Sequence, residues 1–289
     1  MEPKDQPCVV ITGASSGVGK SAARVLAEQG WHVIAHGRDA ERSAAALAEL
    51  RAAASPNAQI DMVLCDLTLL SDTARMADEI AELTPRIDVL INNAGGVRDH
   101  MELTSEGNEI TFAGNHLGHF LLTKRLMSLL QATAARTPPG TVRILATSSE
   151  GHKNARPFDW DDLQGVTTWV TGRNYCTAKL CNMLFTRELA RRGAPLGIVA
   201  NAIHPGEAKT NFAAHAEPWM ARMVEQNDVS PDVGGDTLAW LASAPEMRNV
   251  TGGYFYEREQ LELEPMATDD ANAARLWEES EKLLARSGF

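Results

Sequence analysis

Apolar strand-like runs alternate with helix-like stretches along most of the chain, and this alternation limits the possible folds more than any other feature. Strands are predicted at 8–12, 31–36, 60–65, 87–92, 141–147, 197–203 and 253–256. The first six are apolar or β-branched on both faces, as in a parallel sheet that helices cover on both sides. Helices are predicted between them at 18–29, 40–53, 71–83, 106–134, 174–192 and 231–243. This order predicts right-handed crossovers and an α/β fold, a doubly wound parallel sheet in a three-layer αβα arrangement.

The length of 289 residues suits one large α/β domain or two small ones. We predict a single domain over 1–289 with its core at 8–256, because the chain has no internal repeat, low-complexity tract or long linker. A C-terminal extension, 257–289, follows the core. It contains a last predicted helix at about 269–286, which carries an apolar stripe formed by Leu276, Trp277, Leu283 and Leu284.

The charge balance and the apolar runs exclude several classes of partner. Lys and Arg number 27 against 38 Asp and Glu, a net charge of −11, whereas nucleic-acid binding requires clustered basic residues. No apolar run approaches the roughly 18 residues that span a bilayer, and the first residues do not resemble a secretory signal. We therefore expect a cytoplasmic protein with neither nucleic-acid nor membrane partners. The scattered cysteines predict neither disulfides nor a zinc site.

A glycine-rich loop joins the first predicted strand to the first helix, in residues 9–20 (VVITGASSGVGK). One glycine permits a sharp turn, a second lets a pyrophosphate approach the backbone, and a third lets the helix pack on the strand. The free N–H groups of the helix start attract negative charge. The loop therefore predicts a dinucleotide site formed by Gly13, Ser15, Ser16, Gly17, Val18 and Gly19.

The same loop also fits a loosened phosphate-binding pattern of NTPases in residues 14–21 (ASSGVGKS). Lys20 would then reach the β- and γ-phosphates, and an Asp at another strand end would help to hold Mg²⁺. Asp66 could serve, although the fourth strand ends in residues 92–95 (NNAG) instead. An NTPase that hydrolyses ATP or GTP with Mg²⁺ stays an alternative.

A set of short motifs, in one order over residues 8–256, resembles the short-chain dehydrogenase/reductase family. These motifs are Thr12-Gly13-x-x-x-Gly17-x-Gly19, Asp66, Asn92-Asn93-Ala94-Gly95, Asn115, Ser148-Ser149, Tyr175-x-x-x-Lys179 and Pro205-Gly206. The stretches at 115–123 (NHLGHFLLT) and 175–185 (YCTAKLCNMLF) are similar to the branch that contains the retinol dehydrogenases and their bacterial relatives. The resemblance implies a Rossmann fold and a short-chain alcohol dehydrogenase or carbonyl reductase.

Hydride transfer to a carbonyl needs a proton donor for the developing alkoxide, and Tyr175 can supply it. An unperturbed tyrosine has a pKa of about 10, so we expect Lys179, one helical turn away, to lower it. The resemblance also assigns Lys179 to the nicotinamide ribose, Ser149 to the substrate oxygen, and Asn115 to a water held at a local helix distortion. The predicted catalytic residues are Asn115, Ser149, Tyr175 and Lys179.

The end of the second predicted strand, residues 36–39 (HGRD), bears on the cofactor. NAD usually requires a carboxylate here, whereas an Arg accommodates the 2′-phosphate of NADP. Arg38 is present, and Asp39 is expected to cap the following helix, so we predict NADP(H) rather than NAD(H). The resemblance places Asp66 and Leu67 near the adenine, and Asn93 and Ala94, with Gly95 beside them, near the adenosine ribose. It places Pro205, Gly206 and Thr210 near the nicotinamide.

Two stretches, 150–174 and 207–230, are the family's substrate loops. Their apolar side chains predict a roomy pocket for a bulky hydrophobic or aromatic alcohol or carbonyl, unless they pack beneath the loops as a small core. These side chains are Phe158, Trp160, Leu163, Trp169, Val170, Phe212, Trp219, Met220 and Met223.

Three further expectations concern helices and alternative roles. The resemblance implies a homodimer or homotetramer in which the helices at 106–134 and 174–192 pair with their symmetry mates. His116 and His119 lie one helical turn apart and are interpreted as a solvated or packed pair, with no metal site. A non-catalytic cofactor-binding regulator on the same fold remains an alternative, although it would not need Ser149, Tyr175 and Lys179 together.

Overall fold

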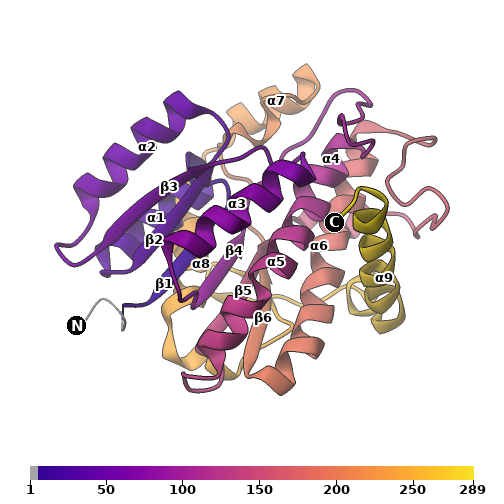
Figure 1. Ribbon diagram of the computed structural model, residues 1–289. Coiled ribbons are helices and arrows are strands. Elements are labelled where there is room, and N and C mark those ends of the chain that lie inside the picture. Colours follow the sequence, from indigo (N-terminus) through magenta and orange to yellow (C-terminus); the bar gives the residue numbers. More distant parts are fainter. Residues whose placement is uncertain (1–5) are drawn as a thin grey trace.

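The computed structural model describes residues 6–289 and contains a mostly parallel sheet flanked by helices (Figure 1). The strand order is β3-β2-β1-β4-β5-β6-β7-β8, and all neighbours are parallel except β7 and β8. The strands are β1 (Cys8–Ile11), β2 (His32–Gly37), β3 (Gln59–Leu64), β4 (Val89–Asn92), β5 (Val142–Thr147), β6 (Ile198–Ile203), β7 (Tyr254–Tyr256) and β8 (Glu259–Gln260). The predicted doubly wound sheet is confirmed. The order reverses between β1 and β4, where such sheets bind ligands.

Two helical layers cover the sheet, as Figure 1 shows. The first layer contains α1 (Gly17–Glu28), α2 (Ala40–Ala53) and α8 (Pro231–Ser243). The second contains α3 (Leu70–Leu83), α5 (Gly118–Ala134) and α6 (Thr171–Gly193). Strand residues alternate between the two layers with the period of a strand: Val9 and Ile11 pack with the first, and Val10 with the second. This explains why both faces of the strands are apolar.

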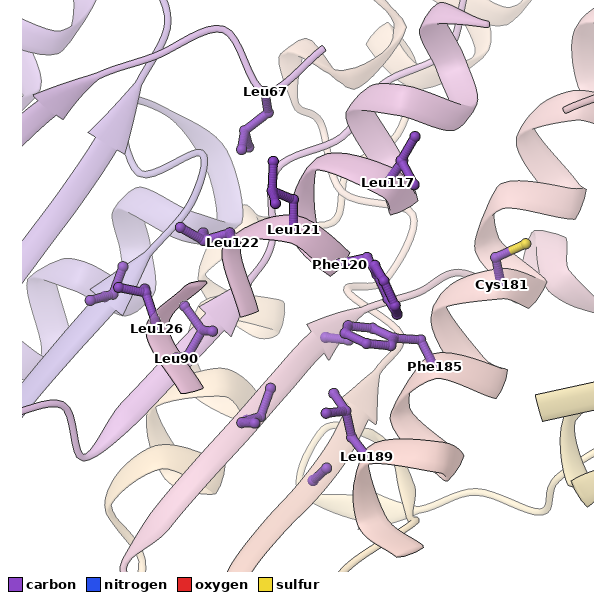
Figure 2. Packing of buried hydrophobic residues seen from close by; sticks show 14 of the residues in the cluster. Leu67, Leu90, Leu117, Phe120, Leu121, Leu122, Leu126, Cys181, Phe185 and Leu189 are labelled. Carbon is purple, nitrogen blue, oxygen red and sulfur yellow. The ribbon is translucent and has the colours of Figure 1, made fainter. Parts of the chain in front are cut away.

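The larger apolar cluster joins α5 and α6 to the sheet. Figure 2 shows Leu90 of β4 facing side chains of α5, and the rings of Phe120 in α5 and Phe185 in α6 close together. The centroids of these two rings are 5.4 Å apart. The packing fixes α5 and α6 against strands β4, β5 and β6. These two helices include most of the residues of the motifs at 115–123 and 175–185.

The helix predicted at 106–134 is interrupted. It begins with α4 (Ile110–Phe112), continues as a π-helical turn over Ala113–Leu117, and resumes as α5. Residues 106–109 lie outside it, because the Glu109 carboxylate accepts a hydrogen bond from the Phe112 N–H at 2.7 Å and caps the start. A single π-helical turn within a helix often marks a functional site. A further helix, α7 (Pro218–Glu225), forms within the predicted loop at 207–230.

The C-terminal extension ends in α9 (Asp270–Arg286), which lies beside α6 in Figure 1 and also contacts α5 through side chains. The Trp277 ring lies 4.9 Å from that of Phe120, and the Arg192 guanidinium lies 4.2 Å from the Trp277 ring. The apolar stripe predicted for this helix is therefore a packing surface. Across residues 6–289, none of the helices combines the length and the apolar character that a bilayer crossing requires.

Candidate active site

The carboxyl ends of β1 to β6 open onto one cavity of about 850 Å³, within the range of cavities that hold cofactors and substrates. Of all the predicted site residues, Gly19 alone does not line this cavity. The structure therefore brings together 18 side chains and backbone segments, which are Gly13, Ser15, Ser16, Gly17, Val18, Arg38, Asp66, Leu67, Asn93, Ala94, Gly95, Asn115, Ser149, Tyr175, Lys179, Pro205, Gly206 and Thr210.

The glycine loop has the backbone geometry that a phosphate cradle needs. Gly13 and Gly17 have φ values of +70° and +57°, in the region that favours glycine. A Cβ on Gly19 would lie 2.5 Å from both the Gly13 carbonyl oxygen and the Asn93 Nδ2, so Gly19 permits the helix to approach the strand. Ser16 precedes α1 without a side-chain cap, which leaves backbone N–H groups of the first turn available to an anion.

His36 holds the glycine loop in place, a role that the sequence did not predict. Its Nδ1 accepts a hydrogen bond from the Gly13 N–H at 3.1 Å, and its Nε2 donates to the Cys65 carbonyl at 2.9 Å. Burial lowers the pKa of His36, so the ring is neutral, as these two bonds require. The only signal for this role in the sequence is a polar residue at the end of a buried strand.

Lys20 points away from the cavity. Its Nζ lies 2.6 Å from Glu49 Oε2 of α2, and it does not line the cavity. The NTPase alternative requires this lysine at the β- and γ-phosphates. The structure therefore removes the main support for that alternative.

Two arginines at the end of β2 face the cavity. Arg38 lines it as predicted, and Arg42, in the first turn of α2, lines it as well. Asp39 caps α2 by accepting a hydrogen bond from the Arg42 N–H at 2.8 Å, which confirms its predicted structural role. Arg38 and Arg42 are thus two of the cations that line the cavity, beside Arg98. The spacing of Arg38 and Arg42, one helical turn, was the available signal for the second arginine.

Lys179 is buried and held by backbone. Its Nζ donates to the Thr147 carbonyl at 3.1 Å and lies 5.6 Å from the centre of the Tyr175 ring. Ser148 donates its hydroxyl to the Lys179 carbonyl at 2.9 Å, so the first serine of the pair serves the backbone. Ser149, the second serine, lines the cavity with its Oγ accepting from the Gly151 N–H at 3.1 Å.

Burial has the largest effect on the pKa of Tyr175 and of Lys179. It raises the pKa of Tyr175 to about 12, against the opposing effect of a hydrogen bond with Ser149, and lowers the pKa of Lys179 to about 8. The predicted lowering of the Tyr175 pKa is wrong in direction here, because burial is the largest cause and raises it, and the charge of Lys179 is not among the causes. Tyr175 is thus a protonated phenol at neutral pH, and Lys179 is charged below its pKa of about 8.

Asn115 lies in the π-helical turn, which is the helix distortion that the sequence analysis expected. Its Nδ2 donates to the carbonyls of Gly96 and Thr111, both at 2.8 Å, and its Oδ1 accepts from the Gly96 N–H at 3.3 Å. These bonds join the turn to the segment that follows β4. Asn115 lines the cavity close to Lys179, because a Cβ on Gly95 would meet both the Asn115 Oδ1 and, at 3.2 Å, the Lys179 Nζ.

The two predicted substrate loops contribute differently. From 207–230, Phe212, Trp219, Met220 and Met223 line the cavity, as predicted. The aromatic residues of 150–174 do not line it, which corrects the prediction. Phe158 stacks on Trp160 at 4.8 Å, and the Arg275 guanidinium of α9 lies 4.5 Å from the Trp160 ring. These rings pack against the extension, the alternative that the sequence had left open.

No group of three or more His, Cys, Asp or Glu residues in the described part of the chain is arranged to hold a metal ion. His116 and His119 are both buried, and each bonds to a different neighbour.

Comparison with known proteins gives consistent matches. Residues 7–159 match the family model described as short chain dehydrogenase. The chain is 37% identical to "Retinol dehydrogenase 13" of Homo sapiens, over 96% of this chain and 84% of that protein. It is 34% identical to a Streptomyces sp. (strain C5) protein with the provisional name daunorubicin C-13 ketoreductase DnrU, over 94% of this chain and 90% of that protein.

Solved structures show the same architecture. An uncharacterized protein from Mycobacterium paratuberculosis superposes with a TM-score of 0.75 at 32% identity, over 97% of this chain and 96% of that chain. An alcohol dehydrogenase from Thermococcus sibiricus, complexed with 5-hydroxy-NADP, gives a TM-score of 0.66 at 21% identity, over 87% and 95%. The second likeness shows the fold alone.

Proposed function

Because the chain belongs to the short-chain dehydrogenase/reductase family, in the retinol dehydrogenase-like branch, we propose that it is an NADP(H)-dependent oxidoreductase that interconverts an alcohol and a carbonyl on a bulky, apolar or aromatic substrate. One observation carries the proposal. Ser149, Tyr175 and Lys179 line the same cavity as the glycine loop and Arg38. A proton donor and a dinucleotide cradle therefore share one space.

The proton chemistry follows from this geometry. When bound, NADP(H) supplies or accepts the hydride. During reduction, the Tyr175 hydroxyl donates its proton to the carbonyl oxygen, which becomes the alcohol oxygen. The Ser149 hydroxyl binds that oxygen and polarises it. The Lys179 ammonium stabilises the phenolate that Tyr175 leaves behind, and oxidation reverses each of these steps.

The residues at the end of β2 support NADP(H) over NAD(H). Arg38 and Arg42 both line the cavity, and a 2′-phosphate is the part of NADP that NAD lacks. Asp39, the carboxylate that follows Arg38 in the sequence, is engaged as the cap of α2 and does not line the cavity.

The apolar side chains of 207–230 support a bulky substrate. Phe212 and Met220 line the cavity, and the Phe212 ring lies 5.6 Å from the Tyr175 ring. Methionine side chains adapt to varied apolar shapes. Two relatives are named after large cyclic compounds. One name refers to retinol, a terpenoid, and the other to daunorubicin, an aromatic ketone.

A substrate panel tests the proposal. Retinal, daunorubicin, acetone and pyruvate would be offered with NADPH, and in parallel with NADH, while cofactor absorbance is followed. We expect turnover of the large apolar carbonyls, faster with NADPH at low cofactor concentration. Reduction of the small polar carbonyls alone would contradict the substrate class. Tight NADPH binding without turnover of any carbonyl would favour the non-catalytic regulator instead.

We also propose a cytoplasmic homodimer or homotetramer. The faces of α5 and α6 carry α9, with Lys124 Nζ 2.7 Å from Glu281 Oε1 and Arg187 Nε 2.7 Å from Asp270 Oδ1. A second copy at this face would therefore contact α9 as well. Light scattering tests the assembly, and a mass of 31.3 kDa in solution would contradict it.

A further inference from the structure

His116 and His119 lie in the same interrupted helix, but their side chains face different parts of the molecule. Both side chains are buried, and burial lowers the pKa of each to about 3. His116 faces the C-terminal helix, with its Nε2 2.9 Å from the Ser280 hydroxyl. His119 faces the sheet, between the glycine loop and the π-helical turn. Neither residue lines the cavity.

The hydrogen bonds of His119 determine where its proton lies. Its Nδ1 is 3.1 Å from the Asn115 carbonyl oxygen, which can only accept, so Nδ1 carries the hydrogen. The ring is neutral, because its pKa lies far below the working pH, so Nε2 is an acceptor. The Thr12 hydroxyl, 2.8 Å from Nε2, therefore donates to it.

Thr12 completes a chain of bonds across the sheet. With its hydrogen given to His119, the Thr12 Oγ1 accepts from the N–H groups of Asn93 at 2.8 Å and Ala94 at 3.0 Å. Asn93 and Ala94 line the cavity after β4, and Thr12 leads into the glycine loop after β1. One imidazole thus links both strand ends of the switch point to the turn that holds Asn115.

We propose that His119 is a positioning residue that fixes the Asn115 backbone and the glycine loop relative to each other. This inference rests on the proposed function, since it assigns Asn115 to the catalytic side and the loop to the cofactor side. The two ring nitrogens serve the two sides separately. Loss of the Nδ1 bond removes the side-chain donor to the Asn115 carbonyl. Loss of the Nε2 bond leaves the Thr12 hydroxyl only the Ile91 carbonyl, 3.3 Å away, as an acceptor.

This separation allows each bond to be removed alone. An asparagine places its amide near the position of Nδ1, and a glutamine places its amide near the position of Nε2. His119→Asn should keep the Asn115 bond and lose the Thr12 bond. His119→Gln should do the opposite. We expect His119→Asn to raise the Kd for NADPH about tenfold with a kcat close to that of the wild type, and His119→Gln to lower kcat about tenfold with the Kd unchanged.

The matched controls are His116→Asn and His116→Gln, one turn earlier in the same helix and equally buried. Both should lower the melting temperature, because they disturb the packing against Ser280, but leave kcat and the Kd for NADPH unchanged. Steady-state reduction of retinal gives kcat, and the fluorescence of bound NADPH gives the Kd.

The two His119 variants decide between positioning and packing. A higher Kd in His119→Asn alone, together with a lower kcat in His119→Gln alone, supports the positioning role. A fall in melting temperature alone, equal to that of the His116 variants, would overturn it, as would identical effects of Asn and Gln. The NADPH fluorescence needs no turnover, so a wild-type protein that reduces no carbonyl would contradict the proposed function while the Kd contrast still tests the linkage of Thr12.

Discussion

The two halves of the cavity are built in different ways. The cofactor half consists of strand ends and backbone, and the glycine loop packs so closely there that a Cβ on Gly13 would lie 2.9 Å from the Ala94 Cα. The substrate half is formed largely by α7 and its flanking loops, where Trp219 and Met223 stay 53% and 51% exposed. Close packing fixes the first half at the level of single atoms, whereas the second half tolerates changes in shape.

The largest effect is expected when a substitution adds one methyl group to the cofactor half, compared with one methyl group added elsewhere in the cavity wall. Gly19→Ala places a Cβ 2.5 Å from the Gly13 carbonyl and Asn93 Nδ2, so we expect the Kd for NADPH to rise about 100-fold. Gly172→Ala is the control, because Gly172 lines the cavity and a Cβ there meets nothing within 4 Å. Fluorescence titration measures both. Equal Kd values for the two variants would show that the cofactor half is not closely packed.

The arginines test whether the cofactor half distinguishes NADP from NAD. Replacing Arg38 and Arg42 together by Ala removes the charge-assisted bonds proposed for the 2′-phosphate, so we expect KM for NADPH to rise about 30-fold while KM for NADH stays constant. Lys20→Ala is the control, since Lys20 pairs with Glu49 outside the cavity. A parallel rise of KM for both cofactors would refute the assignment to the 2′-phosphate.

The pH dependence of the reaction tests the role proposed for the charge on Lys179. Lys179 is charged below its pKa of about 8 and neutral above it, whereas Tyr175, with a pKa of about 12, stays protonated on both sides of that value. Because we propose that the charged form of Lys179 stabilises the Tyr175 phenolate and binds the nicotinamide ribose, we expect kcat/KM for NADPH to decline above pH 8, by up to about tenfold per unit. Lys179→Arg, which stays charged, should lose this decline. A wild-type profile that is flat between pH 7 and 10 is incompatible with this role.

The smallest effect is expected in the substrate half. Trp219→Ala removes a half-exposed ring at the cavity wall, so KM for retinal should rise about threefold without a change in the Kd for NADPH. Phe212→Ala, closer to Tyr175, should have the larger effect on KM. A change in cofactor binding by Trp219→Ala would mean that the two halves are coupled.

The sequence predicted which residues gather at the glycine-loop end of the cavity, because the structural demands there are local. Both faces of β1, β2, β4, β5 and β6 are buried, so strand positions such as Cys8–Ile11 follow from the local apolar pattern. The glycines follow from the turn that they form. Asp39 follows Arg38 directly and precedes a helix, so its capping role was also predictable.

The rest depends on partners that are distant in sequence. His119 bonds to Thr12, 107 residues away, and Trp160 packs under Arg275, so neither role is visible in a local pattern. The π-helical turn at Asn115 rests on bonds to Gly96, 19 residues earlier. The pKa of Tyr175 depends on burial, which a motif does not report. The predicted family was correct, but the direction of that pKa shift and the lining of one loop were not.

The most direct test of the central claim separates proton transfer from cofactor binding. Tyr175→Phe removes the hydroxyl that is proposed as the proton donor and keeps the ring, which packs 5.6 Å from Phe212. The measurement is single-turnover oxidation of NADPH by retinal, beside a fluorescence titration of NADPH. We predict a rate about 1000-fold lower with an unchanged Kd. A variant that reduces retinal at the wild-type rate would contradict the mechanism.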